Sequence, residues 1–159
     1  MALDNATTAP LSTIRPDELA RFNRLAASWW NSAGPMRPLH VMNNLRLGYV
    51  LEQIAERFGR PPGELQGLRI ADIGCGAGLM CEPLAARGAQ VLGVDAASNS
   101  IAAAKLHAAQ SNLAIDYRIG EPREALQADE VFDVMLLLEV VEHVDHLGRF
   151  VQEASSKLK

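Results

Sequence analysis

Three glycines at alternate positions, Gly74, Gly76 and Gly78, stand in the stretch ADIGCGAG, a pattern typical of a ligand-binding loop. Each glycine lacks a Cβ atom, so the backbone can turn sharply and lie close to a bound molecule. Asp95 follows Gly74 after about twenty residues, where a carboxylate can accept hydrogen bonds from both hydroxyls of a ribose. The spacing therefore predicts a nucleoside-binding site.

The glycine spacing separates two kinds of nucleoside ligand. Dinucleotide-binding loops favour G-x-G-x-x-G, whereas the sixth position of GCGAGL is Leu79, which argues against NAD. The compact G-x-G-x-G, preceded by Asp72, resembles the first motif of the class I S-adenosylmethionine methyltransferases, whose ligand has no pyrophosphate. A glycine turn kept only for packing of a strand against a helix is the alternative.

A second group of residues that could do chemistry is Glu139, Glu142 and His143 in LLLEVVEHV. If a helical turn begins there, spacings of three and four place all three on one face. Such a face could bind a metal, with the carboxylates favouring magnesium and the imidazole favouring zinc or iron. The alternatives are a solvated acidic turn without metal, and a general-base role for His143 near neutral pH.

The elements that must position these residues alternate between strand and helix from Leu68 onward. This alternation predicts an α/β fold with a parallel sheet, helices on both faces, and ligands bound at the carboxyl ends of the strands. The expected strands are 68–73, 90–94, 114–119 and 132–138, and the expected helices are 79–88, 98–111, a short one from Pro122, and 146–159.

Two helices are expected before the sheet, at 16–30 and 44–58, with a loop between them where Gly34, Pro35 and Pro38 oppose regular structure. The division of the chain follows from this pattern. We expect a disordered lead at 1–15, an N-terminal helical cap at 16–66 and the S-adenosylmethionine-binding α/β domain at 67–159.

Composition excludes several classes of protein. The chain has 159 residues and a net charge of -4, which suits one globular domain and argues against a nucleic-acid partner. Its 2 cysteines are too few for a disulfide framework and fit a reducing cytosol, and its longest apolar run is too short to span a bilayer. We therefore expect a cytoplasmic protein.

Several segments together resemble the ubiquinone biosynthesis O-methyltransferases. They are RFNRLAASWWNSAGPMRPLHVMNNLRLGYV, ADIGCGAGL, AKLHA and LLLEVVEHV, and the resemblance runs from Phe22 to Leu158. It implies a Rossmann-like class I methyltransferase fold with an N-terminal helical extension. It also implies O-methylation of polyprenyl phenol or quinol substrates, namely 3-demethylubiquinol and 2-polyprenyl-6-hydroxyphenol, with S-adenosylmethionine as the methyl donor.

The resemblance assigns roles to individual residues. It assigns Gly74 to the cofactor site, and we include Gly76 and Gly78 in that site because they belong to the same loop. His143 and Glu142 are the expected catalytic residues, acting on the hydroxyl that is methylated. The expected cofactor-binding residues are Arg46, Gly74, Gly76, Gly78, Asp95 and Leu138, and the magnesium ligands implied by E-x-x-E-H are Glu139, Glu142 and His143.

The resemblance also raises expectations about partners and completeness. Trp29 and Trp30 could line a polyprenyl-binding or membrane-facing surface, or they could pack in the core. Peripheral contact with the inner membrane or with a ubiquinone-biosynthesis complex is therefore one expectation. Relatives continue after KLK with further strands, so C-terminal strands are expected to be missing. The alternatives to the quinone enzyme are a class I methyltransferase for another small molecule and a cofactor-binding module without catalysis.

Overall fold

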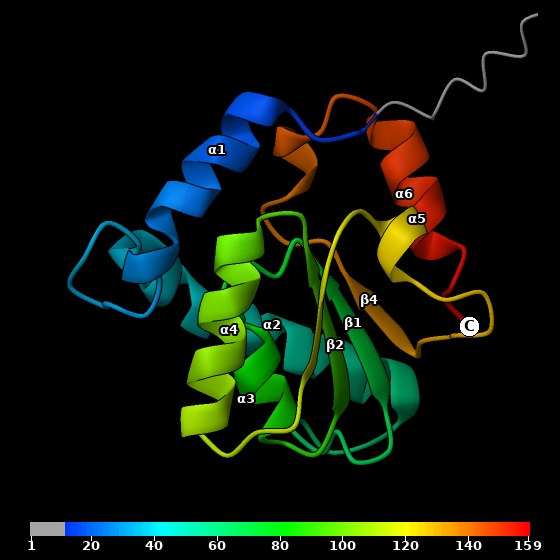
Figure 1. The fold of residues 1–159 in the computed structure, drawn as a ribbon. Helices are drawn as coiled ribbons and strands as arrows, with labels where there is room; N and C mark the ends of the chain where they lie inside the picture. The colour runs from blue at the N-terminus through cyan, green and yellow to red at the C-terminus, as the bar shows by residue number, and fades with distance from the viewer. Residues whose placement is uncertain (1–11) are drawn as a thin grey trace, which may run out of the picture.

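A four-stranded parallel sheet forms the centre of the computed structural model, which describes residues 12–159 (Figure 1). The strand order is β3-β2-β1-β4, and every neighbouring pair is parallel. The predicted parallel α/β fold is therefore confirmed. The strands are β1 Arg69–Ile73, β2 Gln90–Asp95, β3 Asp116–Ile119 and β4 Val134–Leu136.

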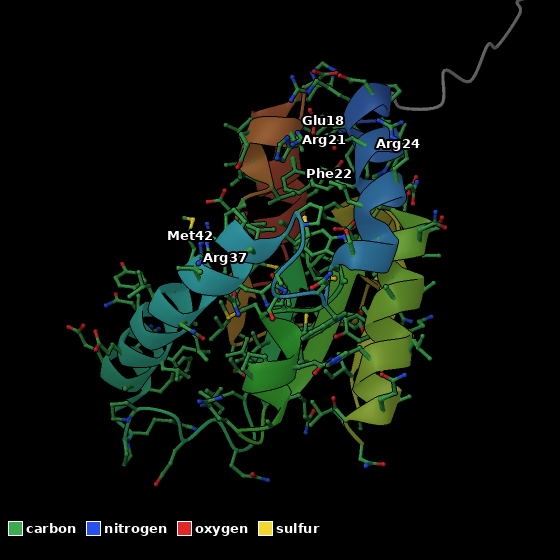
Figure 2. The ribbon with its side chains drawn as sticks, turned by 90° about the vertical axis from the view of Figure 1, so that its left-hand side faces the viewer. Glu18, Arg21, Phe22, Arg24, Arg37 and Met42 are labelled. Atoms are coloured by element: carbon green, nitrogen blue, oxygen red, sulfur yellow. The ribbon has the colours of Figure 1, made fainter. Side chains whose placement is uncertain are left out.

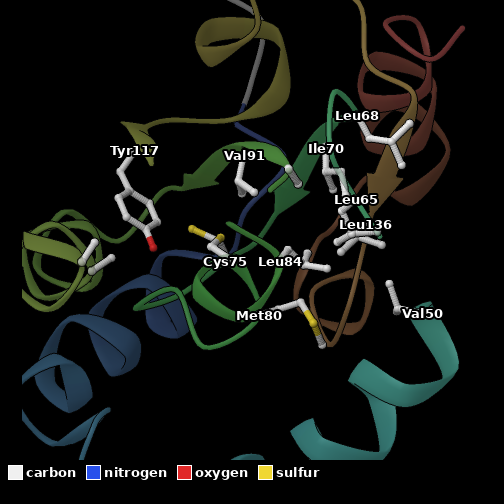
Figure 3. Packing of buried hydrophobic residues seen from close by; sticks show 14 of the residues in the cluster. Val50, Leu65, Leu68, Ile70, Cys75, Met80, Leu84, Val91, Tyr117 and Leu136 are labelled. Atoms are coloured by element: carbon white, nitrogen blue, oxygen red, sulfur yellow. The ribbon is translucent and has the colours of Figure 1, made fainter. Parts of the chain in front are cut away.

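Helices cover both faces of this sheet because apolar side chains alternate along the strands. Ile70 pairs in register with Val91, and both belong to the core cluster on one face (Figure 3). Ala71 and Leu92 are the next pair and belong to the cluster on the other face. The first face packs against α2 Arg37–Phe58, α3 Cys81–Ala85 and α4 Ser98–Gln110, and the second against α5 Pro122–Ala125 and α6 Leu147–Ser155.

The N-terminal helices differ from their expected bounds. Helix α1 covers Pro16–Leu25, and a 3-10 turn, η1 Ala26–Ser28, replaces the end of the expected helix. Helix α2 begins at Arg37, so the predicted start at Asn44 was wrong. The error came from treating Pro38 as a breaker, whereas proline fits the first helical turn, where its missing N–H would have no intrahelical partner.

Part of the expected disordered lead is ordered. Thr13 is fully buried, and its backbone N–H and side-chain hydroxyl both donate hydrogen bonds to Glu121. Ile14 forms an antiparallel bridge with Val144. The prediction was therefore wrong for residues 12–15, and its remainder, residues 1–11, lies outside the described residues.

A bidentate ion pair stabilises the outer strand of the sheet. Arg118 in β3 donates from Nη1 to Glu130 Oε2 at 2.7 Å and from Nη2 to Glu130 Oε1 at 2.8 Å. This guanidinium lowers the pKa of Glu130 from its ordinary value of 4.5 to about 2. A carboxyl whose pKa falls on folding stabilises the fold above its ordinary pKa, and this contribution is lost as the pH falls toward the folded value.

We predict that Glu130→Gln lowers the free energy of unfolding at pH 7 by about 1.5–3 kcal/mol, because a hydrogen bond to a charged group is lost. The difference in the free energy of unfolding between the variant and the wild type should be smaller at pH 3 than at pH 7. Urea unfolding at both pH values measures this, with Glu56→Gln on the exposed side of α2 as the control. An equal loss at both pH values contradicts the assignment.

Candidate functional site

The glycine loop lies at the carboxyl ends of β1 and β2, as predicted. The backbone amides of Gly74 and Cys75 both donate to Val94 O, at 2.8 and 3.0 Å, which turns the chain sharply after β1. Gly76 N then donates to Asp95 Oδ2 at 2.8 Å, and Ala97 N donates to Asp95 Oδ1 at 2.8 Å. Asp95 thus lies at the same edge of the sheet as the loop, as predicted, and its hydrogen bond to the loop backbone is a contact that the sequence did not predict.

The Asp95 carboxylate can still take a ligand in this arrangement. Burial raises its pKa, while the amides of Ala97 and Gly76 act in the opposite direction because they stabilise the charged form. Each carboxylate oxygen has two lone pairs, and these amides occupy one on each. The remaining acceptor sites suit two neighbouring hydroxyls, as in a ribose.

Each of the three loop glycines avoids a clash with a different side chain. All have positive φ angles, and a Cβ on Gly76 would lie 2.5 Å from Cη2 of Trp29. A Cβ on Gly74 would lie 2.4 Å from Val140. Gly78 instead faces the Tyr117 hydroxyl, away from the pocket described below, so packing explains this third glycine.

Side chains of the N-terminal segment hold the loop from the other side. Trp30 Nε1 donates to Ala77 O at 3.1 Å, and Asn43 Nδ2 donates to Leu79 O at 2.9 Å. His40 Nε2 lies 2.7 Å from Trp29 O, within hydrogen-bonding distance. Trp29 is buried and Trp30 half-buried, which fits the core-packing alternative and argues against a membrane-facing surface, and Trp29 also lines the pocket described below.

A pocket of about 330 Å³ opens between this N-terminal segment and the edge of the sheet. Small-molecule sites have volumes of about 300–1,000 Å³. Glu18, Phe22 and Asn43 also line it and had no assigned role, because nothing in their local spacing relates them to the glycine loop. The predicted site residues in its lining are Arg46, Gly74, Gly76, Asp95, Leu138, Glu139 and His143.

The helical face predicted for the second group does not form. Glu139 has a φ of 54°, so the chain cannot continue as a helix there, and a 3-10 turn, η2 Val141–His143, follows. Glu139 instead pairs with Arg46 at 2.6 Å, and Glu142 is exposed outside the pocket lining. The predicted gathering of Glu139, Glu142 and His143 was therefore wrong.

This geometry does not fit the magnesium site implied by the resemblance. Within residues 12–159, no group of three or more His, Cys, Asp or Glu side chains is placed to hold a metal ion. Within the predicted set, His143 Nε2 lies 3.9 Å from Glu142 Oε1, and Glu139 is paired with Arg46. Hard cations need several converging oxygen ligands, which these side chains do not supply.

His143 lies in the pocket with a carboxylate beside it. Its Nδ1 is 3.1 Å from Glu18 Oε2, a close contact whose angles do not make a hydrogen bond. The Phe22 ring packs against the imidazole at 5.1 Å in an edge-on arrangement. Figure 2 shows Glu18 and Phe22 on the side of α1 that faces the segment carrying His143. An imidazole in this setting can take a proton from a ligand.

Asp72 adds an unusual carboxyl to the same pocket. It is buried, lines the pocket and accepts a weak hydrogen bond from Cys81 Sγ at 3.3 Å. Burial raises its pKa to about 7, so the carboxyl changes its charge near neutrality. The sequence pointed to Asp72 only as the residue before the glycine loop.

Residues 71–159 match the methyltransferase domain family. The ubiquinone biosynthesis O-methyltransferase of Mesorhizobium japonicum is 50% identical over 151 residues, which cover 93% of this chain and 61% of that protein. The protein of the same name from Bradyrhizobium diazoefficiens is 49% identical over 158 residues, covering 98% of this chain and 62% of its own length. The resemblance is confirmed, and the chain spans less than two thirds of these relatives.

Solved structures support the fold assignment. Magnesium protoporphyrin IX methyltransferase from Synechocystis PCC 6803 matches with a TM-score of 0.70 and 18% identity, covering 94% of this chain and 75% of that one. At this identity the match establishes the fold. The Rossmann-like α/β architecture with an N-terminal helical extension is therefore confirmed.

We predict that Gly76→Ala destabilises the fold by about 2–4 kcal/mol, because the new methyl group meets Trp29 at a left-handed φ. Gly48→Ala is the matched control, since no atom lies within 4 Å of its Cβ position on α2. The control should be unchanged or more stable by up to about 1 kcal/mol. Urea unfolding compares them, and equal stability of the two variants contradicts the described contact.

Proposed function

The chain belongs to the methyltransferase domain family, and on this basis we propose that it binds S-adenosylmethionine and transfers the methyl group to a phenol hydroxyl. The observation that carries the proposal is the Asp95 carboxylate held against the glycine loop at one side of the pocket. A ribose bound there would place the rest of the cofactor along the loop.

Arg46 is proposed to bind the methionine carboxylate of the cofactor. It lines the pocket and already holds one carboxylate, that of Glu139. A guanidinium has five N–H donors, so it can share a second carboxylate or exchange one for the other. Leu138, beside Glu139 in the pocket lining, supplies an apolar contact for the adenine.

We further propose polyprenyl catechols as the acceptor class, within ubiquinone biosynthesis. The names of the relatives support this, and so does the apolar part of the pocket. Side chains of α1 and α2 contribute Leu19, Phe22, Leu25 and Leu39 to the lining. Such a surface suits a lipophilic substituent next to the reacting hydroxyl.

His143 is the proposed general base of the transfer. It would take the proton from the phenol, and the phenolate oxygen would attack the methyl carbon in line with the sulfonium, giving a methyl ether and S-adenosylhomocysteine. The Glu18 carboxylate lies beside Nδ1 of this imidazole, at 3.1 Å. Because the predicted magnesium ligands do not converge, no step of this scheme involves a metal.

We predict that His143→Gln lowers the methylation rate roughly 100- to 10,000-fold, because general-base catalysis contributes about that factor. The assay follows labelled methyl transfer from S-adenosylmethionine to a short-chain 2-prenyl-6-hydroxyphenol. His146→Gln, an exposed neighbour outside the pocket lining, is the control and should keep its rate.

An undiminished rate in His143→Gln removes the proposed base. Transfer to unrelated phenols but not to the prenylated catechol would favour another small-molecule methyltransferase. Cofactor binding without transfer to any phenol would favour the cofactor-binding module.

Peripheral membrane contact is a separate proposal, carried by the outer face of α2. Val41, Leu45 and Tyr49 follow each other at helical spacing and are 55%, 77% and 64% exposed. Arg37 and Met42 lie on the outer side of the same helix (Figure 2). The opposite face of α2 lines the pocket through Leu39, Asn43 and Arg46.

The occupant that fits this face is an anionic lipid surface. Apolar side chains would enter the interface, while the exposed Arg37 at the start of the same helix would meet the headgroups. Within residues 12–159, no helix is long and apolar enough to cross a membrane. The contact would bring the pocket near lipid-dissolved substrate.

We predict that Leu45→Glu weakens partition onto phosphatidylglycerol vesicles roughly tenfold, because an apolar side chain is no longer buried. Co-sedimentation at low and high salt measures the bound fraction. Leu106→Glu is the control, since Leu106 is a 63% exposed leucine on α4. An equal loss in both variants, or wild-type binding that salt does not weaken, contradicts the proposal.

A further inference from the structure

Three side chains outside the pocket lining form a connected group that neither the resemblance nor the proposed chemistry uses. Glu82 on α3 is buried, with a relative exposure of 7%. Its Oε1 lies 2.7 Å from Nδ1 of His107 on α4. A buried carboxylate is costly unless a partner donates to it. In the part of the chain that the structure describes, His107 is the side chain placed to do so.

The other end of the group is Trp30. Its indole stacks on the His107 imidazole with 3.5 Å between ring centroids and 2° between the planes. The ring held in this way directs Nε1–H to Ala77 O at 3.1 Å. Ala77 belongs to the glycine loop and is fully buried, so its carbonyl is shielded from water there.

The group therefore joins three stretches of the chain that are far apart in the sequence. Glu82 follows the loop on α3, His107 lies near the end of α4, and Trp30 follows η1 in the N-terminal cap. A second contact supports the same junction, because Asn23 Oδ1 on α1 accepts from the backbone amide of Asn99 in the first turn of α4. The cap is thus fixed to α4 on the side where it covers the loop.

We propose that Glu82, His107 and Trp30 are positioning residues that hold the glycine loop in its ligand-binding shape from outside the pocket. Glu82 orients His107, His107 supports the indole of Trp30, and Trp30 fixes the Ala77 carbonyl. Disturbing any member loosens the backbone between Gly74 and Met80. The effect on cofactor affinity rests on the proposed function, whereas the effect on the loop does not.

Variants that each remove one contact can test the members of the group one at a time. Trp30→Phe keeps a ring for the stack but removes the N–H that reaches Ala77. His107→Phe keeps the stack but leaves the Glu82 carboxylate without its donor, and adding Glu82→Gln removes that buried charge. Lys105→Gln, at an exposed position on the same helix as His107, is the matched control.

Hydrogen exchange of the ligand-free chain, read on peptides covering residues 74–80, measures the loop directly. Trp30→Phe and His107→Phe should speed exchange there roughly tenfold, as expected when one hydrogen bond of about 1.4 kcal/mol is lost. The Glu82→Gln, His107→Phe double variant should recover much of the protection. Lys105→Gln should match the wild type.

Calorimetric titration with S-adenosylhomocysteine gives the second reading. Trp30→Phe and His107→Phe should bind it roughly three- to tenfold more weakly, although neither residue lines the pocket. If hydrogen exchange at residues 74–80 is as slow in both variants as in the wild type, the proposal is overturned, even if the melting temperatures of the variants fall. The group would then contribute only to packing. A wild-type chain that does not bind the ligand contradicts the proposed function, and the exchange data still decide the role of the group.

Discussion

The carboxylate of Asp95 accepts hydrogen bonds from the amides of Gly76 and Ala97, and the site depends on this arrangement. It ties the loop after β1 to the end of β2. The parallel pairing of β1 with β2 already places these two strands side by side. One side chain therefore both shapes the loop and presents acceptor atoms to a ligand. The burial that shields this contact also raises the pKa of Asp95, and the amide donors oppose that rise.

The N-terminal segment turns this sheet edge into a pocket. Trp29 occupies the space above Gly76, so the loop is closed on one side by an aromatic ring from the cap. Helix α2 joins the main core through Val50 and Ile54 while its first half lines the pocket. The cap thus lines the candidate pocket and shares the core of the sheet. The outer face of α2 leaves Leu45 exposed, and this is the face proposed to contact a lipid surface.

Local chemistry explains which features the sequence could predict. The glycine spacing and the position of Asp95 are set by backbone geometry within one strand-helix-strand unit, β1-α3-β2, so the loop was recognisable without any long-range information. The start of α2 was misplaced because proline has opposite effects in the first turn and in the interior of a helix. Glu139 was placed on a helix, whereas its backbone is left-handed and its side chain pairs with Arg46, which belongs to a distant segment. The contact between His143 and Glu18 joins opposite ends of the chain, and no spacing rule indicates it.

Calorimetric titration of the chain with S-adenosylmethionine, with NAD as the comparison ligand, tests the central claim most directly. We expect saturable binding of S-adenosylmethionine, no detectable binding of NAD, and loss of binding in an Asp95→Asn variant that circular dichroism shows to be folded. Binding of NAD alone, undiminished binding of S-adenosylmethionine by Asp95→Asn, or no binding by a folded wild-type chain would contradict it.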